Sequence, residues 1–208
     1  MVRVWIADIT PLLIEETYLK YYENVPTWRK DKADCLKIEA DRARSIGAWT
    51  LWERVRKQER IPGDAIYNLS HSGDYALCAY SDQPEVQVGC DVEEVKEARL
   101  RVARRYFCEK EYQCIQGKEN KDEQAEMFYR FWVLKESFMK ATRRGMALDM
   151  RTYEFAWNLE GDPELIKKPQ EYPETYYFRE YHEEWIHARV VVCSTDPKID
   201  PRLHILEL

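Results

Sequence analysis

The sequence predicts an α+β fold made of two similar subdomains in a pseudo-twofold arrangement, each a small sheet packed on a long helix. Two segments with strand character, Tyr75–Tyr80 and Val86–Glu93, and two amphipathic helices, residues 34–57 and 126–144, support this prediction. Each half begins with a strand that bears an acidic residue, contains one long helix and closes on an apolar strand. This faint self-similarity favours two related α+β units with a functional site in the cleft between them.

The division between the halves is predicted at Ser81–Pro84, because the segments that precede it resemble those that follow it. We therefore expect an N-terminal subdomain of residues 1–84 and a C-terminal subdomain of residues 85–208.

In the first half, Val2–Ile9 has strand character and ends at Thr10–Pro11, and Glu15–Tyr22 is expected to be helical. The long helix of residues 34–57 follows, because its apolar residues recur at helical spacing. A turn at Pro62–Asp64 leads toward the strand Tyr75–Tyr80.

In the second half, Val86–Glu93 alternates apolar and polar residues and predicts a strand. The helix of residues 126–144 carries a broad apolar stripe that predicts packing on a core. The acidic segment 158–174 contains three prolines and predicts a loop. Residues 200–208 indicate no structure or function.

Composition indicates a globular, cytoplasmic monomer without membrane or nucleic-acid partners. The chain of 208 residues is 45% hydrophobic, and no apolar run approaches the length needed to span a membrane. A net charge of -6 argues against general affinity for nucleic acids. The six cysteines form no C-x-x-C pair, so we expect neither disulfides nor a zinc site.

The strand Val86–Glu93 places two carboxylates on one face. Asp91 and Glu93 are two residues apart, which separates them by roughly 6 to 7 Å, and Gly89 on the same face leaves room for a bulky neighbour. Like charges this close repel unless a cation lies between them. Carboxylates without cysteine or histidine at ligand spacing suit Mg²⁺. The alternative is an ordinary solvated strand face.

The helix of residues 126–144 places Trp132, Glu136 and Lys140 at four-residue intervals along the border of its apolar stripe. Glu136 and Lys140 would form an ordinary favourable ion pair on one helix, contributing about 0.2 to 0.5 kcal/mol. A partly desolvated carboxylate can instead bind a metal or act as a general base, and an ammonium one turn away can hold a phosphate.

Motifs on these two elements resemble the signature of the 4′-phosphopantetheinyl transferases, most closely the long, surfactin-synthetase-activating type. The strand contributes Val88–Glu93 (VGCDVE) and the helix contributes Phe131–Lys140 (FWVLKESFMK). Asn68–Ser72 (NLSHS) and Arg105–Tyr112 (RYFCEKEY) match the same type. Together these segments cover most of residues 66–146.

The resemblance implies transfer of the 4′-phosphopantetheine arm of coenzyme A to a serine of an acyl or peptidyl carrier protein, with release of adenosine 3′,5′-bisphosphate. Asp91, Glu93 and Glu136 would hold Mg²⁺ against the pyrophosphate. Glu136 would also take the serine proton, directly or through a water, and Lys140 would offset charge on the transferred phosphate.

The resemblance also implies that coenzyme A lies in the cleft, as the substrate. Ser70 and His71 would contact its phosphates, together with basic residues of the first half. The candidates, among which the sequence does not discriminate, are Arg29, Lys32, Arg42 and Arg44.

A basic cluster interleaved with apolar residues suits an acidic partner surface with an apolar centre, such as a carrier protein in this family. The alternative is a solvated helix. The cluster consists of Lys96, Arg99, Arg101, Arg104 and Arg105.

Two other function classes remain open at this stage. A non-catalytic module that binds coenzyme A would be expected to have lost part of the carboxylate set, which is complete here. A Mg²⁺-dependent hydrolase of nucleotide anhydrides would use the same carboxylates without the docking cluster.

Overall fold

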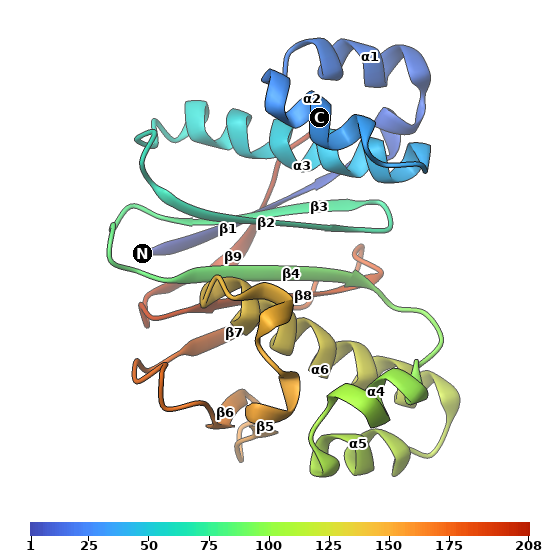
Figure 1. Cartoon of the computed structure of the whole chain (residues 1–208), viewed down its shortest axis with the longest axis vertical. Coiled ribbons are helices and arrows are strands. Elements are labelled where there is room, and N and C mark those ends of the chain that lie inside the picture. Colours follow the sequence, from blue (N-terminus) through green and yellow to red (C-terminus); the bar gives the residue numbers. More distant parts are fainter.

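The computed structural model describes residues 1–208 and has two lobes, each a sheet covered by one long helix (Figure 1). The first lobe holds a four-stranded sheet in the order β2-β3-β1-β9, covered by α3. Its elements are β1 (Val2–Asp8), a 3₁₀ turn (Thr10–Leu13), α1 (Glu15–Glu23), α2 (Thr27–Asp34), α3 (Glu39–Gln58), β2 (Ile66–Ser72), β3 (Tyr75–Ser81) and β9 (Ile199–Ile205).

The second lobe holds a three-stranded antiparallel sheet in the order β4-β8-β7, covered by α6, and a two-stranded hairpin. Its elements are β4 (Val88–Glu94), α4 (Leu100–Tyr106), α5 (Glu109–Gln116), α6 (Lys121–Ala141), 3₁₀ turns at Gly145–Ala147 and Met150–Thr152, β5 (Glu154–Trp157), β6 (Pro163–Lys167), β7 (Tyr177–Tyr181) and β8 (Ala188–Ser194). The predicted α+β class, with two similar subdomains each built on a long helix, is confirmed.

The two sheets share one apolar core. Val4 and Leu77 of the first sheet cluster with Cys90, Val92 and Val192 of the second. Separate clusters lie under α3 and under α6. Burial of these apolar faces on folding is the main force that holds the lobes against each other.

At one margin of this shared core, polar side chains of β2 join the two lobes. Asn68, Ser70 and Ser72 alternate along β2 and bond to β4, where Asn68 Oδ1 accepts from the Cys90 N–H at 3.0 Å. Ser72 donates to Glu93 Oε2 at 2.7 Å. We call this contact between β2 and β4 the seam.

The structure departs from the predicted elements in the first lobe. The predicted helix of residues 34–57 begins at Glu39, because α2 ends at Asp34 and Ile38 is extended. Glu39 and Asp41 in the first turn favour a new start here, since acidic residues stabilise a helix N-terminus. The charged segment around Trp28 forms α2, which was not predicted.

Two further differences concern the second half. The predicted loop 158–174 contains β6, which pairs with β5. Residues 199–205 form β9, which runs parallel to β1 at the edge of the first sheet, where Pro201 is tolerated. The division at residue 84 stays a prediction, but the last strand lies across it.

All six cysteines are free, and four of them are buried. None of the helices combines the length and the apolar character that crossing a membrane requires.

Candidate active site

Asp91 and Glu93 lie on the face of β4 that meets helix α6. Cys90 and Val92, which alternate with them along the strand, point into the core shared by the sheets. Gly89 is required by this packing, because a Cβ there would lie 2.1 Å from the Ser137 carbonyl oxygen. The bulky neighbour expected beside Gly89 is therefore the backbone of α6 itself.

Helix α6 brings Lys140 to Asp91. The Lys140 ammonium donates to Asp91 Oδ1 at 2.6 Å and to the Ser70 hydroxyl oxygen at 2.9 Å. The Ser70 hydroxyl in turn donates to Asp91 Oδ1 at 2.7 Å. Lys140 forms its ion pair with Asp91, and none with Glu136. The simple pairing of Glu136 with Lys140 along the helix is thus not what the structure contains.

Two of the three predicted metal ligands have their pKa raised by a neighbouring carboxylate. Burial, and then the charges of Asp91 and Glu93, raise the pKa of Glu136 to about 7 against an opposing effect of Lys140. Burial and Asp91 raise the pKa of Glu93, while the Ser72 hydrogen bond lowers it. Burial also raises the pKa of Asp91, although Lys140 and Ser70 act in the opposite direction. Such clustered negative charge is relieved by a bound cation.

One observation fits a metal ion at this point. Asp91 Oδ2 is buried and has no hydrogen-bond partner, which is costly unless something else satisfies it. The donors are carboxylate oxygens, the ligands that Mg²⁺ prefers. Histidine, cysteine and acidic side chains nowhere gather as a preformed group of three or more that could hold a metal. The assignment of Asp91, Glu93 and Glu136 to Mg²⁺ therefore stays a prediction.

The structure separates the four basic candidates for binding coenzyme A. Arg42 pairs with Glu39, and Arg44 pairs with Asp41 and donates to the Gly73 carbonyl oxygen. Arg29 and Lys32 have no carboxylate partner. The candidates without an acidic partner are the better suited to a phosphate.

Arg29 and Lys32 are held in different ways. Arg29 is 7% exposed, and its guanidinium lies 4.9 Å from the Trp28 ring and 5.1 Å from the Trp49 ring. Its Nε is buried without a partner, and burial lowers the pKa of Arg29. Lys32 is exposed, and partial desolvation and the charge of Arg29 lower its pKa.

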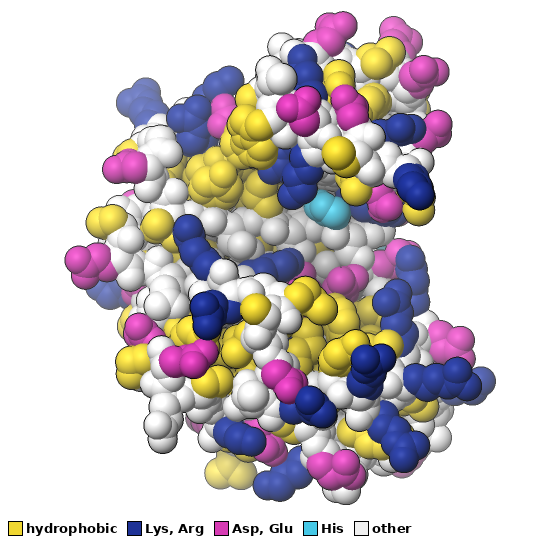
Figure 2. Space-filling model, in the orientation of Figure 1, with side chains coloured by type: hydrophobic (Ala, Val, Ile, Leu, Met, Phe, Trp, Pro, Cys, Tyr) yellow, Lys and Arg dark blue, Asp and Glu magenta, His cyan; other side chains and the backbone are white.

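His71 lies among cations. Partial desolvation, followed by the charges of Lys140, Arg44 and Lys32, lowers the pKa of His71 to about 4. The His71 side chain is exposed. A neutral His71 can donate one hydrogen bond. Figure 2 shows a hollow between the two lobes, with Lys and Arg side chains on both walls.

A groove of about 660 Å³ lies beside helix α6 on the second lobe, and we call it the α4–α6 groove. Trp132 and Met139 of α6 line it together with Tyr106. Of the predicted basic cluster, Arg99 and Arg105 line this groove, whereas Arg101 and Arg104 are exposed outside it. The remaining lining residues are Val102, Met146, Ala147, Leu148, Asp149, Met150 and Arg151.

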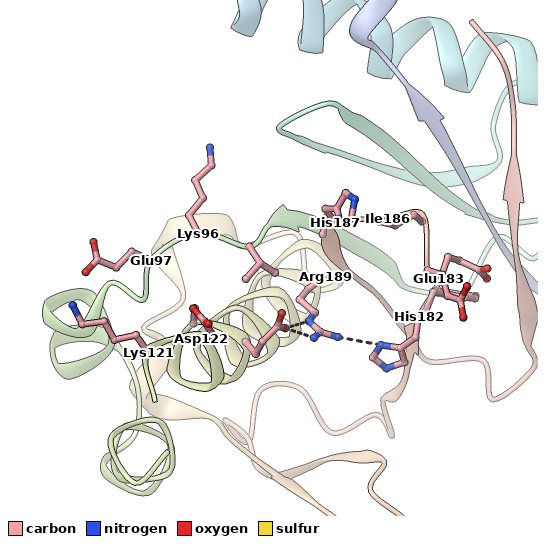
Figure 3. A pocket seen from close by; sticks show the side chains of 15 residues that line it. Lys96, Glu97, Lys121, Asp122, His182, Glu183, Ile186, His187 and Arg189 are labelled. Atoms are coloured by element: carbon pink, nitrogen blue, oxygen red, sulfur yellow. Dashed lines mark hydrogen bonds and ion pairs between the residues drawn. The ribbon is translucent and has the colours of Figure 1, made fainter. Parts of the chain in front are cut away.

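Lys96, the fifth member of the basic cluster, lies elsewhere. It pairs with Glu94 and lines a separate hollow of about 750 Å³ between the start of α6 and the β7–β8 hairpin (Figure 3). There Arg189 contacts Glu126 and His182. None of the predicted catalytic residues lines this hollow.

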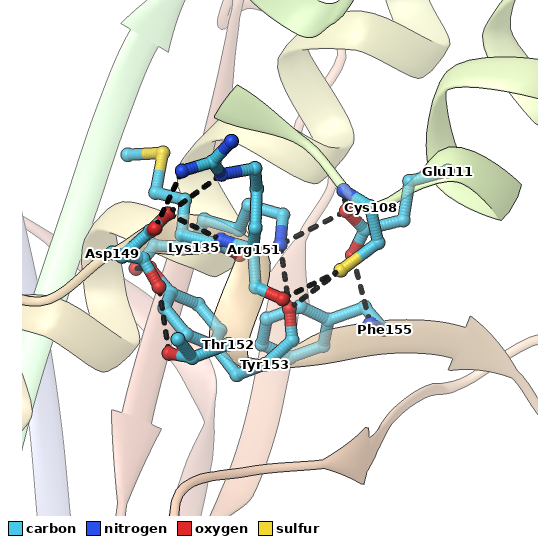
Figure 4. Close-up of polar contacts among 9 residues, drawn as sticks. Cys108, Glu111, Lys135, Asp149, Arg151, Thr152, Tyr153 and Phe155 are labelled. Carbon is cyan, nitrogen blue, oxygen red and sulfur yellow. Dashed lines mark hydrogen bonds and ion pairs between the residues drawn. The ribbon is translucent and has the colours of Figure 1, made fainter. Parts of the chain in front are cut away.

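Sequence reasoning assigned no role to Lys135 and Glu111, which form a fully buried ion pair at 2.9 Å behind the groove (Figure 4). The sequence does contain a sign of a buried charge, because Lys135 interrupts the apolar stripe of α6 directly before Glu136.

The part of the chain that matches known proteins contains the carboxylates and the lysine of the candidate site. A family model described as the 4′-phosphopantetheinyl transferase superfamily matches residues 87–192, which include β4, α6 and β8 almost to its end. The 4′-phosphopantetheinyl transferase Sfp of Bacillus subtilis (strain 168) is 32% identical over 137 residues, which cover 64% of this chain and 57% of that protein. The 4′-phosphopantetheinyl transferase gsp of Aneurinibacillus migulanus is 32% identical over 120 residues, which cover 58% of this chain and 48% of that protein.

The chain thus spans about half the length of these curated relatives. Among solved structures, the holo-[acyl-carrier-protein] synthase of Neisseria meningitidis has a TM-score of 0.42 and 18% identity over 52% of this chain and 95% of that one, too distant to support an argument. The family model covers more than half of the 208 residues, and it includes both motifs on which the resemblance was based. The chain therefore belongs to the 4′-phosphopantetheinyl transferase superfamily.

Proposed function

We propose that this protein transfers the 4′-phosphopantetheine arm of coenzyme A to a serine hydroxyl of an acyl or peptidyl carrier protein and releases adenosine 3′,5′-bisphosphate. The observation that carries the proposal is the convergence of Asp91 and Lys140, 2.6 Å apart, with Glu136 near enough for the charges of both to shift its pKa. Family membership and the complete carboxylate set support the same conclusion.

Asp91, Glu93 and Glu136 would hold Mg²⁺, which when bound neutralises charge on the pyrophosphate. Glu136 would also take the proton of the carrier serine. Before a metal binds, burial and the charge of Asp91 raise the pKa of Glu136 to about 7. The Lys140 side chain is 25% exposed, and its ammonium, although paired with Asp91, would also place its charge near the transferred phosphate.

Coenzyme A phosphates would be bound on the first lobe by the cations that lack an acidic partner, Arg29 and Lys32, with a hydrogen bond from His71. Arg42 and Arg44, which were candidates too, are engaged with Glu39 and Asp41. Ser70 is less suited to bind a phosphate than predicted, because its hydroxyl hydrogen is donated to Asp91. Its role would be to orient Asp91 and Lys140.

The carrier protein would dock on the α4–α6 groove. The groove combines apolar residues such as Trp132 and Met139 with the cations Arg99 and Arg105, which suits an acidic helix with an apolar face. Trp132 lies one helical turn before Glu136, so docking here would bring the serine toward the carboxylates. We further propose that the protein acts as a cytoplasmic monomer, without nucleic-acid or membrane partners.

The test is mass spectrometry of an apo carrier protein incubated with coenzyme A, Mg²⁺ and this protein. Addition of one phosphopantetheine group to the carrier is the expected result, and a carrier with its serine replaced by alanine is the control. Bound coenzyme A that stays intact would identify a non-catalytic module. Cleavage of the pyrophosphate without a modified carrier would identify a hydrolase.

A further inference from the structure

Lys135 is a lysine with no accessible surface in the middle of helix α6. Its ammonium is 2.9 Å from Glu111 Oε2 and donates to the carbonyl oxygens of Met150 and Tyr153, each at 2.8 Å. It also lies 4.5 Å from the centre of the Tyr153 ring. All three donors of the ammonium are therefore used, and two of them hold the backbone after α6 (Figure 4).

Glu111 completes the same network from helix α5. Its Oε2 accepts from the Cys108 N–H at 2.8 Å, and its Oε1 accepts from the Phe155 N–H at 2.9 Å. The Tyr153 hydroxyl closes a loop by donating to the Lys135 carbonyl oxygen at 3.2 Å. Three separate segments, α5, α6 and residues 150–155, are thus fixed to one another by a single pair of charges.

A buried ion pair is weak evidence for stability, because desolvation of both charges opposes their attraction and apolar residues often serve as well. Apolar residues, however, cannot donate hydrogen bonds to the carbonyl groups of Met150 and Tyr153. The pair therefore determines where the segment Met150–Tyr153 lies against α6. That segment forms part of one wall of the α4–α6 groove, since Met150 and Arg151 line it.

Lys135 directly precedes Glu136 in the helix, and Trp132 of the groove lies one turn earlier. We propose that Lys135 is a positioning residue that fixes the groove wall relative to Glu136. The serine of a docked carrier protein is thereby held in the correct position relative to the carboxylates. This inference rests on the proposed function, because it assigns the groove to the carrier protein.

The experiment compares three variants in steady-state transfer to one carrier protein. Lys135→Met removes both carbonyl contacts, and we expect the carrier KM to rise and kcat to fall, roughly tenfold in kcat/KM or more, with an unchanged KM for coenzyme A. Glu111→Gln breaks the same ion pair but leaves the lysine bonded to both carbonyls. It should lower the melting temperature and keep the carrier KM within about twofold of wild type.

Arg130→Met is the matched control for the loss of an ion pair on the same helix. Arg130 pairs with Glu180 of β7, away from the groove, and it should lower stability without changing the carrier KM. If Lys135→Met does not fold, Lys135→Arg replaces it, since the larger planar guanidinium keeps the charge but must displace the two carbonyl groups from their present positions.

A lysine variant that folds and keeps the wild-type carrier KM would overturn the inference, as would a KM that follows melting temperature across all variants. The proposed function is judged separately by the wild-type protein. If wild-type protein leaves the apo carrier unmodified, the function is wrong, whereas transfer by wild type and lysine variants with equal KM removes the positioning role alone.

Discussion

The Lys140 ammonium of helix α6 lies 2.6 Å from Asp91 Oδ1 on strand β4, and the Ser70 hydroxyl of β2 bonds to the same oxygen. The first and second lobes therefore meet at one buried carboxylate. Its second oxygen, Oδ2, has no partner. Asp91 is 2% exposed, so it is far more buried than a residue on an open strand face.

Asp91→Asn should lower transfer by about 10²-fold or more, since the amide keeps the size but removes the negative charge that a bound cation needs. Single-turnover transfer measured with Mg²⁺ tests this. The asparagine variant is preferable to Asp91→Ala, because alanine would leave the hydrogen bonds of Ser70 and Lys140 unmet at a cost of about 1 to 3 kcal/mol. Near-wild-type rates in the asparagine variant would remove Asp91 from the site.

Glu136→Gln should stabilise the metal-free protein at high pH. The pKa of Glu136 rises from 4.5 to about 7 on folding, so the folded protein binds more protons between these values. The free energy of unfolding of the wild-type protein therefore falls as pH rises through this window. This loss of stability is complete above a pH of about 7. Glutamine does not titrate and should be more stable than wild type by about 1 to 3 kcal/mol at high pH.

Urea unfolding at a series of pH values measures this difference. Equal stability of wild type and Glu136→Gln across the whole range would show that the carboxylate is not strained. In transfer assays the same variant should lose roughly 10²- to 10⁴-fold in kcat together with the acidic limb of the pH profile. A variant that keeps both would leave Glu136 without a role as base.

Lys32→Ala should weaken coenzyme A binding more than Arg42→Ala does. Lys32 has no acidic partner, whereas Arg42 is paired with Glu39 at 3.8 Å. We expect a loss of roughly fivefold or more for Lys32→Ala, diminishing as salt is added, because an exposed charge is screened. Calorimetric titration with coenzyme A measures both. Equal effects of the two substitutions would contradict the assignment.

Charge reversal at Arg105 should raise the carrier KM more than reversal at Arg101. Arg105 lines the α4–α6 groove, and Arg101 is exposed outside it. Because rim charges act mainly on association, kcat should change little and the salt dependence of KM should weaken. Steady-state kinetics with one acidic carrier protein measure the KM of both variants. A change in coenzyme A affinity would instead place Arg105 in the substrate cleft.

Gly89→Ala should destabilise the protein and lower transfer together. Its Cβ would lie 2.1 Å from the Ser137 carbonyl oxygen and 2.3 Å from the Ala141 nitrogen, so α6 must move away from β4. Overpacking of this kind costs about 1 to 3 kcal/mol or more. Gly63→Ala is the control, because nothing lies within 4 Å of a Cβ there. Equal melting temperatures for the two variants would show that the helix tolerates the shift.

The elements that the sequence predicted well are those with a strong local pattern. The alternation of Val86–Glu93 located β4, and the apolar stripe around Phe131 located α6, which begins five residues earlier than expected. Local pattern also placed Asp91 and Glu93 on one face. It could not show that Lys140 would reach Asp91, because that contact depends on the approach of helix and strand at Gly89.

The features that could not be predicted from the sequence depend on contacts with residues far away in the chain. Strand β9 has little apolar alternation and forms by pairing with β1. Ser72 gains its function as a donor to Glu93 only because β2 and β4 lie side by side. Lys135 is stable inside the core only because Glu111 and two carbonyl groups surround it. None of these partners is near in sequence.

The position of β9 bears on how this protein reaches its folded state. Val2 pairs with Ile199, so the first sheet is completed by a contact that spans nearly the whole chain. Such pairing cannot form on the ribosome until the second lobe has been synthesised, and long-range pairings of this kind slow folding. The same strand ties the end of the second lobe to the edge of the first, so the two lobes are joined at both β3–β4 and β8–β9. A double connection of this kind restricts hinge opening, so under the proposed function coenzyme A would enter the cleft by side-chain and loop motions.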